Sequence, residues 1–422
     1  MQPTRTGAIL GFALALAFLL AVGPAHAIIE GISGTNFAFS ARAGTTSFPD
    51  GSTMPTWSFC QTGGDFQYPG PTLKLTAGQT VTITLKNELP PQAGNVSMVF
   101  PGHKVTATGG VGPPGHLVRE AANGGGTVTY TFTVPHPGTY CYYSGTNMDV
   151  QIDMGLVGAM IVYPSTPGQA YDSADSAYDR EYLFLETEMD PVIHQAMACA
   201  QAVTVDTTAF FPVYWHLNGR SAPDTMAMAN ADWLPAQPYN CWPQMEPGER
   251  MLMRIINMGR DTHPFHHHGN NATIIARDGR LLQSPGGTGA DLAESDFTQT
   301  VACGSTQDAI FTWTGEGLGW DIYGHAPTDP TEPNEYTPDH GKPFPVTLPQ
   351  EQELVFGGLY SGSPFLGAPG YLPPGEGGMN PYGGFAYMWH SHNEKEMTTN
   401  DIFPGGMMTN CIIQPPGTLP AP

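Results

Sequence analysis

The sequence predicts an all-β protein built from two Greek-key β-sandwich domains. Only 12% of its 422 residues are charged, while 52 glycines and 41 prolines separate short apolar stretches. Short runs bounded by turn-forming residues are typical of the strands of antiparallel sandwiches. The chain is long enough for two or three domains with buried cores, and its second half repeats the organisation of the first.

The first 27 residues have the pattern of a secretory signal peptide. Arg5 supplies a positive charge, an apolar core runs from Ile9 to Val22, and Ala25-His26-Ala27 has the small-x-small form of a cleavage site. We therefore expect a secreted or periplasmic protein whose mature chain begins at Ile28. The apolar core is short for a membrane helix and no later segment is apolar for long enough, so no membrane span is expected.

Residues 28–164 are predicted to form the first domain. The alternation V-T-I-T-L-K-N at 81–87 indicates a half-buried strand, because successive side chains of a strand face opposite sides. Residues 127–134 alternate in the same way, and the apolar run 156–162 indicates a buried strand that closes the domain. A polar linker rich in Ala, Ser and Asp is predicted at 165–180.

Residues 181–415 are predicted to form the second domain, followed by a tail at 416–422. In this half, G-E followed by R-M-L-M-R-I-I-N repeats the pattern G-Q-T followed by V-T-I-T-L-K-N, and G-F-A-Y-M-W-H-S-H repeats G-T-Y-C-Y-Y-S-G. The second unit is longer because of an insertion at about 328–384 that is crowded with Pro and Gly. Such a segment is either a functional lid or a covering loop.

Charge limits the classes of binding partner, and cysteine content bears on disulfide bonding. The formal net charge is -22 with only 15 Lys and Arg, so the field repels nucleic acid and favours cations. The six cysteines are expected to form disulfides, since they are even in number in an exported chain. If each domain pairs its own cysteines, Cys60 with Cys141 is the natural pair. Reactive or metal-binding thiols are the alternative, although no Cys-x-x-Cys occurs.

Two His-x-His pairs predict a metal site. One lies in D-T-H-P-F-H-H-H-G at 261–269, and the other lies in W-H-S-H near the C-terminus. Residues two apart on a strand share a face, so two such pairs on separate strands can converge on one metal ion or on two. Imidazole suits copper, zinc, iron and nickel. The expected metal ligands are His266, His268, His390 and His392.

Each of these residues also has an interpretation without a metal. The histidines could be ordinary hydrogen-bonded side chains, which is the expectation for His267 on the opposite face. Glu394 and Glu396 could add an oxygen ligand or orient an imidazole, but a solvated loop face is the alternative. Methionine can bind Cu(I), yet core packing is the expectation for this set. The set comprises Met148, Met154, Met397, Met407 and Met408.

Several of these residues resemble the multicopper oxidases, which are built from cupredoxin domains. Y-P-G-P-T-L at 68–73 resembles the opening strand of the family's first domain, and P-G-T-Y followed by G-L-V-G-A-M-I-V resembles that domain's end. H-P-F-H-H-H-G resembles the motif His-x-x-His-x-His-Gly, and H-S-H resembles the motif His-Cys-His. The resemblance covers most of the mature chain. It implies cupredoxin-like domains, a copper cofactor and, as in the two-domain laccase-like members, a homotrimer with copper between subunits.

The sequence departs from the family at the type 1 copper, whose ligands are two His and one Cys thiolate. By resemblance His263 holds the first ligand position, but Ser391 stands at the Cys position and Glu396 at the second His position. A serine hydroxyl is neutral near pH 7 and cannot replace a thiolate, so no blue copper is expected in the second domain. His263 is then either a metal ligand or a packed, hydrogen-bonded side chain, and Glu396 is either a metal ligand or part of a solvated loop face.

The first domain lacks most of the copper ligands that the resemblance implies. Tyr143-Ser144-Gly145 stands where one His-x-His belongs, and only His103 remains near the other. If this domain instead corresponds to the type 1 domain of copper nitrite reductases, Ser144 falls at the Cys position and Met154 at the axial position.

Three interpretations follow. The retained histidines favour a copper-binding protein with altered or lost redox chemistry, with zinc or no metal as alternatives. An active oxidoreductase with a reduced copper set is the second interpretation, and a metal-free structural or assembly protein is the third.

Overall fold

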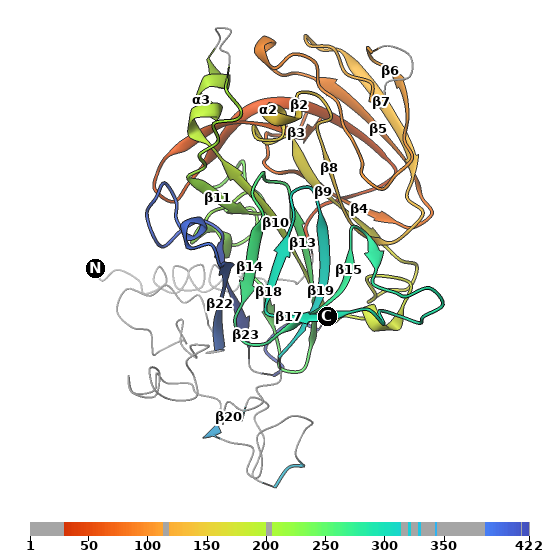
Figure 1. The fold of residues 1–422 in the computed structure, drawn as a ribbon, viewed down its shortest axis with the longest axis vertical. Coiled ribbons are helices and arrows are strands. Elements are labelled where there is room, and N and C mark those ends of the chain that lie inside the picture. The colour runs from red at the N-terminus through yellow and green to blue at the C-terminus, as the bar shows by residue number, and fades with distance from the viewer. Residues whose placement is uncertain are drawn as a thin grey trace, which may run out of the picture.

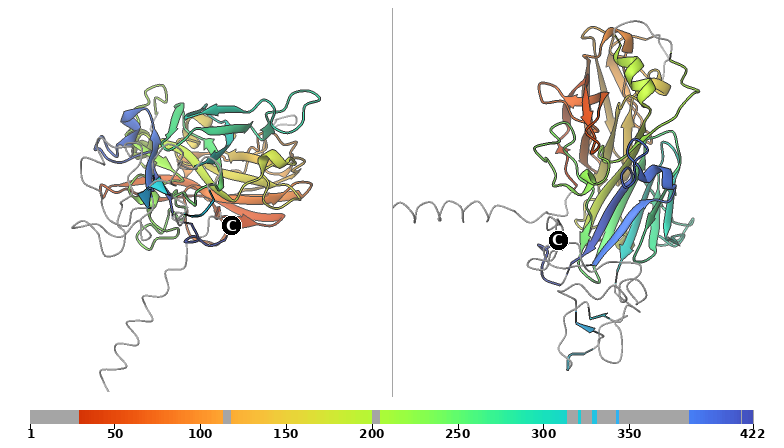
Figure 2. Two further views of the ribbon diagram at one scale, coloured as in Figure 1. Left: turned by 90° about the horizontal axis from the view of Figure 1, so that it is seen from below. Right: turned by 90° about the vertical axis from the view of Figure 1, so that its left-hand side faces the viewer.

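The computed structural model describes residues 29–112, 118–199, 205–313, 320–321, 328–330, 342–343, 385–414 and 416–421. In these residues the chain folds into two β-sandwiches (Figure 1). The N-terminal sandwich, red to yellow, and the C-terminal sandwich, green to blue, stay distinct in the two further views of Figure 2. The predicted all-β class and the two-sandwich architecture are confirmed.

The N-terminal sandwich consists of a five-stranded and a four-stranded sheet. The first has the order β3-β2-β5-β7-β6, with β2 (Asn36–Ser47), β3 (Thr53–Gln61), β5 (Thr80–Asn87), β6 (Thr106–Gly109) and β7 (Thr127–Thr133). The second has the order β1-β4-β9-β8, with β1 (Ile32–Ser33), β4 (Gly70–Thr76), β8 (Gly138–Tyr143) and β9 (Val157–Tyr163). The predicted strands at 81–87, 127–134 and 156–162 are confirmed as β5, β7 and β9.

The C-terminal sandwich consists of a seven-stranded and a five-stranded sheet. The larger sheet has the order β11-β10-β13-β19-β15-β16, and β17 also pairs with β15. Its strands are β10 (Arg180–Met189), β11 (Tyr214–Leu217), β13 (Arg250–Asn257), β15 (Ala272–Arg277), β16 (Arg280–Leu281), β17 (Glu294–Asp296) and β19 (Thr306–Thr312). The smaller sheet has the order β12-β23-β22-β14-β18. Its strands are β12 (Gln244–Met245), β14 (His263–His267), β18 (Thr298–Val301), β22 (Phe385–Ser391) and β23 (Met408–Ile413).

Short helices join these strands. They are η1 (Pro91–Ala93), α2 (Met148–Gln151), η2 (Ala174–Ser176), α3 (Pro191–Ala198), η3 (Asp224–Met226) and η4 (Glu394–Met397). α3 begins where the sequence supplies both helix-start signals: the Asp190 side chain accepts a hydrogen bond from the Val192 backbone, and Pro191 occupies the first turn. Among the described residues, no helix is long and apolar enough to cross a membrane.

The internal repeat that the sequence predicts is present in the strand pairing. β2 pairs in parallel with β5, which pairs antiparallel with β7. In the second sandwich β10, β13 and β19 pair in the same two ways. The second sheets also correspond, because β4-β9-β8 and β12-β23-β22 share one parallel and one antiparallel pairing. The G-Q-T and G-E motifs therefore precede equivalent strands.

The two sandwiches are joined through a shared apolar contact and a hydrogen bond from a buried arginine. One hydrophobic cluster contains Val157 and Ile161 of β9 together with Leu185 of β10 and Ile256 of β13. Beside it the fully buried Arg254 of β13 binds Glu181 at 2.8 Å and donates to Thr139 of β8 at 2.9 Å. Burying this guanidinium is tolerated only because its carboxylate partner is buried with it.

The predicted disulfides are wrong, because all six cysteines are free thiols in the structure. Alternation along the strands explains why Cys60 and Cys141 do not meet. Their neighbours Phe59 and Tyr142 face the same core, with ring centroids 5.8 Å apart. Cys60 and Cys141 therefore point away from that core on opposite sides of the sandwich. Cys60 instead lies against the backbone carbonyls of Ser58 in β3 and Gln67 before β4, and Cys141 packs in the contact between the sandwiches.

Two of the predicted segments lie wholly or mostly outside the described residues. The signal peptide at 1–27 lies outside the described residues, as does most of the insertion at about 328–384. Of that insertion the structure describes 328–330 and β21 (Lys342–Pro343), which pairs in parallel with β20 (Trp320–Asp321).

Candidate metal centre

The four predicted ligands come together on the outer face of the smaller sheet of the second sandwich. β14 and β22 are antiparallel neighbours, and His266 lies directly opposite His390. His268 and His392 follow two residues further along each strand, so all four imidazoles share one face. The inward side chains between them, Phe265 and Trp389, belong to the sandwich core. The sequence period of two thus places the histidines outside and the aromatic residues inside.

The imidazole rings are close enough to share one metal ion. One ring nitrogen from each of His266, His268 and His390 lies within 4.8 Å of the others. Nε2 of His268 is 3.4 Å from Nε2 of His390, close to the separation of about 3.3 Å between two nitrogens bound to one tetrahedral metal ion. The ring of His392 lies 4.9 Å from that of His266, centroid to centroid, and its side chain is 52% exposed. The cluster is therefore open to solvent on the His392 side.

Hydrogen bonds orient two of the rings with Nε2 toward the cluster. Nδ1 of His390 lies 2.7 Å from the backbone carbonyl of Ser391, so this nitrogen carries the proton and Nε2 keeps its lone pair. Nδ1 of His266 bonds to the Thr298 hydroxyl of β18 at 2.9 Å. Metal-binding histidines in proteins commonly use their second nitrogen in this way.

The electrostatics favour neutral imidazoles. Burial, followed by repulsion from the neighbouring rings, lowers the pKa of His268 to about 4. The same two causes lower the pKa of His266 and of His390 below the ordinary histidine value. Free-base rings with converging lone pairs are the form that binds a cation. The donor set of this cluster therefore fits copper or zinc.

His267 is a hydrogen-bonded core residue, as the sequence predicts. Its side chain is buried on the inner face of β14, where Nδ1 bonds to the Asn270 carbonyl at 2.9 Å and Nε2 lies 3.3 Å from the Gln299 amide. Burial lowers the pKa of His267 to about 4. Met154, Met397 and Met407 are also buried in the structure, which confirms core packing for these three. Met148 is 47% exposed.

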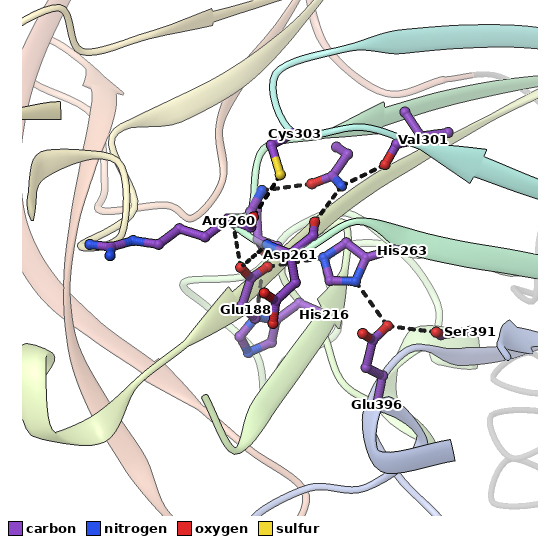
Figure 3. A network of polar contacts seen from close by, with 12 residues as sticks. Glu188, His216, Arg260, Asp261, His263, Val301, Cys303, Ser391 and Glu396 are labelled. Carbon is purple, nitrogen blue, oxygen red and sulfur yellow. Dashed lines mark hydrogen bonds and ion pairs between the residues drawn. The ribbon is translucent and has the colours of Figure 1, made fainter. Parts of the chain in front are cut away.

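His263 and Glu396, the two further predicted ligands, lie apart from the four-histidine cluster. His263 is three positions from His266, so its side chain points into the sandwich rather than out of it. Its Nδ1 lies 2.8 Å from Glu396 and its Nε2 lies 3.0 Å from Glu188 (Figure 3). Glu396 also accepts the Ser391 hydroxyl at 2.5 Å. Each of these side chains therefore hydrogen-bonds to a neighbour inside the protein.

The residues at the type 1 position do not fit a copper-thiolate site. Ser391 is fully buried, and its hydroxyl is a donor to Glu396. In the first sandwich Ser144 is likewise buried, and its hydroxyl donates to the Gln151 amide at 2.6 Å. His103 bonds to the Pro101 carbonyl and packs edge-on against Tyr140. In the described part of the first sandwich, Ser144 and His103 therefore make amide, carbonyl and aromatic contacts inside the protein.

Sequence reasoning missed two acidic residues of β10. Glu186 and Glu188 alternate in the run L-F-L-E-T-E-M, so both point into the second sandwich. Both carboxylate oxygens of Glu186 are buried without a hydrogen-bond partner. Burial, partly offset by the charge of His263, raises the pKa of Glu186 to about 8. Two carboxylates spaced two residues apart in the run L-F-L-E-T-E-M were the available sequence signal.

Comparisons with known proteins show which family the first sandwich resembles. Residues 45–167 match the family model for multicopper oxidases. This stretch resembles a multicopper oxidase domain. L-ascorbate oxidase of Cucurbita maxima is 35% identical over 100 residues, or 23% of this chain and 16% of the relative. Iron transport multicopper oxidase fetC of Epichloe festucae is 35% identical over 97 residues, or 23% of this chain and 15% of the relative. The matches thus span about one sixth of these relatives.

Solved structures extend the likeness of fold beyond the multicopper oxidase domain. The multicopper oxidase mgLAC superposes with a TM-score of 0.56 and 15% identity, covering 93% of this chain and 88% of its own. A copper nitrite reductase from Nitrosomonas europaea gives a TM-score of 0.51 and 17% identity, covering 91% and 94%. At this identity the likeness shows the fold alone, and it confirms the predicted cupredoxin-like β-sandwich fold.

Proposed function

We propose that this chain is an exported protein related to the multicopper oxidases that binds copper through His266, His268, His390 and His392. The observation that carries the proposal is the convergence of three imidazole nitrogens within 4.8 Å on one sheet face. The neutral state of the rings supports it, since protonated imidazole cannot coordinate a metal. Copper is favoured because the multicopper oxidase domain implies it, and zinc is the alternative that the donor set allows.

We further propose that this copper takes no electrons through a type 1 centre. A type 1 copper would need a thiolate, and the place of that ligand is taken by the Ser391 hydroxyl. The bound ion would supply Lewis acidity and a site for an exogenous ligand on the exposed His392 side. The histidines hold the ion, while Thr298 and the Ser391 carbonyl keep the His266 and His390 rings in place.

The proposal includes the limits of the mature protein. We propose a signal peptide at 1–27, a first domain at 28–164, a linker at 165–180, a second domain at 181–415 and a tail at 416–422. The strand pairing supports the division, since β9 ends at Tyr163 and β10 begins at Arg180. Mass spectrometry of exported protein tests the cleavage site. Light scattering tests the trimer that the family resemblance implies.

Titration of the purified mature chain with Cu(II), followed by calorimetry and electron paramagnetic resonance, tests the metal site. We expect one tightly bound ion with nitrogen hyperfine structure and no intense thiolate absorption. His266→Ala should lose this ion, and the matched control His136→Ala, at an exposed position on the first sandwich, should retain it. Equal binding by the two variants would refute the site, and turnover of a phenol substrate would refute the loss of redox chemistry.

A further inference from the structure

Three elements of the second sandwich meet at His263. Glu188 comes from β10 in the larger sheet, His263 begins β14 in the facing sheet, and Glu396 belongs to η4 (Figure 3). Both nitrogens of the ring face a carboxylate oxygen, at 3.0 Å for Glu188 and 2.8 Å for Glu396. All three side chains are at most 1% exposed. We call this set the Glu188–His263–Glu396 triad.

The contacts of the two carboxylates define the charge of the ring. Glu396 accepts the Ser391 hydroxyl on one oxygen and the Asn393 amide on the other. Glu188 accepts the backbone N–H groups of Arg260 and Asp261. Because every bond made by these oxygens is accepted from a donor, both groups fit as ionised carboxylates. The ring between them then donates from both nitrogens and is an imidazolium.

Burial disfavours this charge, but the two carboxylates outweigh it. Desolvation lowers the pKa of His263, whereas its hydrogen bonds to Glu188 and Glu396 raise it, and the result is a pKa of about 11. The third carboxyl group nearby, Glu186, has no donor of its own, and the charge of His263 favours its ionised form. His263 is therefore the counter-ion for Glu188 and Glu396 in one buried space.

We propose that this fixed imidazolium supplies the positive charge that a metal ion would supply at the type 1 position. The Glu188–His263–Glu396 triad in this way positions the strands that carry the copper-binding histidines. The triad spans the sandwich from β10 to β14, and Ser391 extends it to β22 between His390 and His392. His263 lies three residues before His266 on the same strand. The triad thus fixes the relative position of the two strands whose outer faces carry the four imidazoles. This inference rests on the proposed copper site for its functional meaning, while the charge of His263 is independent of copper.

Nitrogen NMR of the metal-free chain, labelled in histidine, tests the charge of His263. We expect one ring with protons on both nitrogens from about pH 5 to about pH 9, whereas an ordinary histidine titrates near 6.5. A His263 ring that loses a proton between pH 5 and pH 8 would overturn the proposal. This measurement uses the unaltered protein, so it does not depend on the folding of any variant.

Glu396→Gln tests the positioning role, because it keeps the shape of the side chain and removes one charge. We expect copper affinity to fall by about tenfold to 100-fold, as for other residues that orient metal ligands. In the metal-free variant the ring signals of His266 and His390 should also shift. The matched control is Glu181→Gln, which breaks another buried pair, with Arg254, at the contact between the sandwiches.

The control separates positioning from loss of stability. Glu181→Gln should destabilise the fold while leaving copper affinity and the cluster ring signals unchanged. Equal effects of the two variants on the cluster would overturn the positioning role. If the unaltered chain bound no copper, the proposed function would fail, and the ring shifts in metal-free Glu396→Gln would still decide whether the triad positions the histidines.

Discussion

Glu186 gives a quantitative prediction about stability and pH. Its side chain is fully buried on β10, and neither carboxylate oxygen has a hydrogen-bond partner. Burial raises the pKa of Glu186 from 4.5 to about 8, and the nearby carboxylates of Glu396 and Glu188 add to this rise against the opposing charge of His263. The folded protein therefore holds a proton that the unfolded chain has already released between these two values.

The direction in which stability changes with pH follows from proton binding at Glu186. Between about pH 4.5 and about pH 8 the unfolded state binds fewer protons than the folded state at this site, so the free energy of unfolding falls as the pH rises. Each unit of pKa difference corresponds to about 1.4 kcal/mol. From pH 5 to pH 8, the titration of Glu186 should therefore lower the free energy of unfolding by about 3 kcal/mol.

Glu186→Gln removes this titration without changing the size of the side chain. Urea unfolding followed by tryptophan fluorescence at pH 5 and pH 8 should show that the variant loses about 3 kcal/mol less than the unaltered chain. Glu294→Gln, at a largely exposed position, is the matched control and should follow the unaltered chain within about 0.5 kcal/mol. The same pH dependence in Glu186→Gln and the unaltered chain would refute the assignment of a buried, protonated carboxyl group.

The remaining predictions concern the contact between the sandwiches, the ligand orientation, the acid sensitivity of metal binding and the thiols. Arg254→Met should destabilise the fold by about 3 to 5 kcal/mol in urea unfolding, because it leaves Glu181 buried without its cation; a change as small as that of the exposed control Arg277→Met would contradict this. Thr298→Val should weaken copper binding by about tenfold in calorimetry, since it removes the hydrogen bond to His266, whereas Thr300→Val on the same strand should have no effect. Copper should remain bound as the pH falls through the ordinary histidine value of about 6.5, because the pKa values of His266, His268 and His390 are lowered; release near this value would count against the cluster. In the native protein Cys199 and Cys303, the two exposed cysteines, should react with a thiol reagent and the four buried cysteines should not.

Local alternation made much of the fold and the outer cluster predictable from sequence. The pattern at 81–87 identifies β5 because its apolar positions all face one core. The same period of two places His266 with His268 and His390 with His392, so the composition of the cluster could be predicted. Which strands are neighbours could not be derived from local pattern, and the pairing of β14 with β22 brings together residues more than one hundred positions apart.

The parts that could not be predicted depend on contacts across the sandwich. His263 resembles a metal ligand by its place in the motif, but the structure turns it toward Glu188, which lies 75 positions earlier in the chain. Glu396 resembles a ligand for the same reason and meets the other side of the same ring. The expected Cys60–Cys141 disulfide is absent for a related reason. The side of the sheet to which a side chain points depends on which core its strand covers, and this is a property of the whole sandwich.

Anomalous diffraction at the copper edge, from crystals of the copper-loaded chain, tests the central claim most directly. We predict one peak of anomalous density among the ring nitrogens of His266, His268, His390 and His392, and none between His263 and Ser391. A copper peak at His263, or copper-loaded crystals with no density at the four imidazoles, would contradict it.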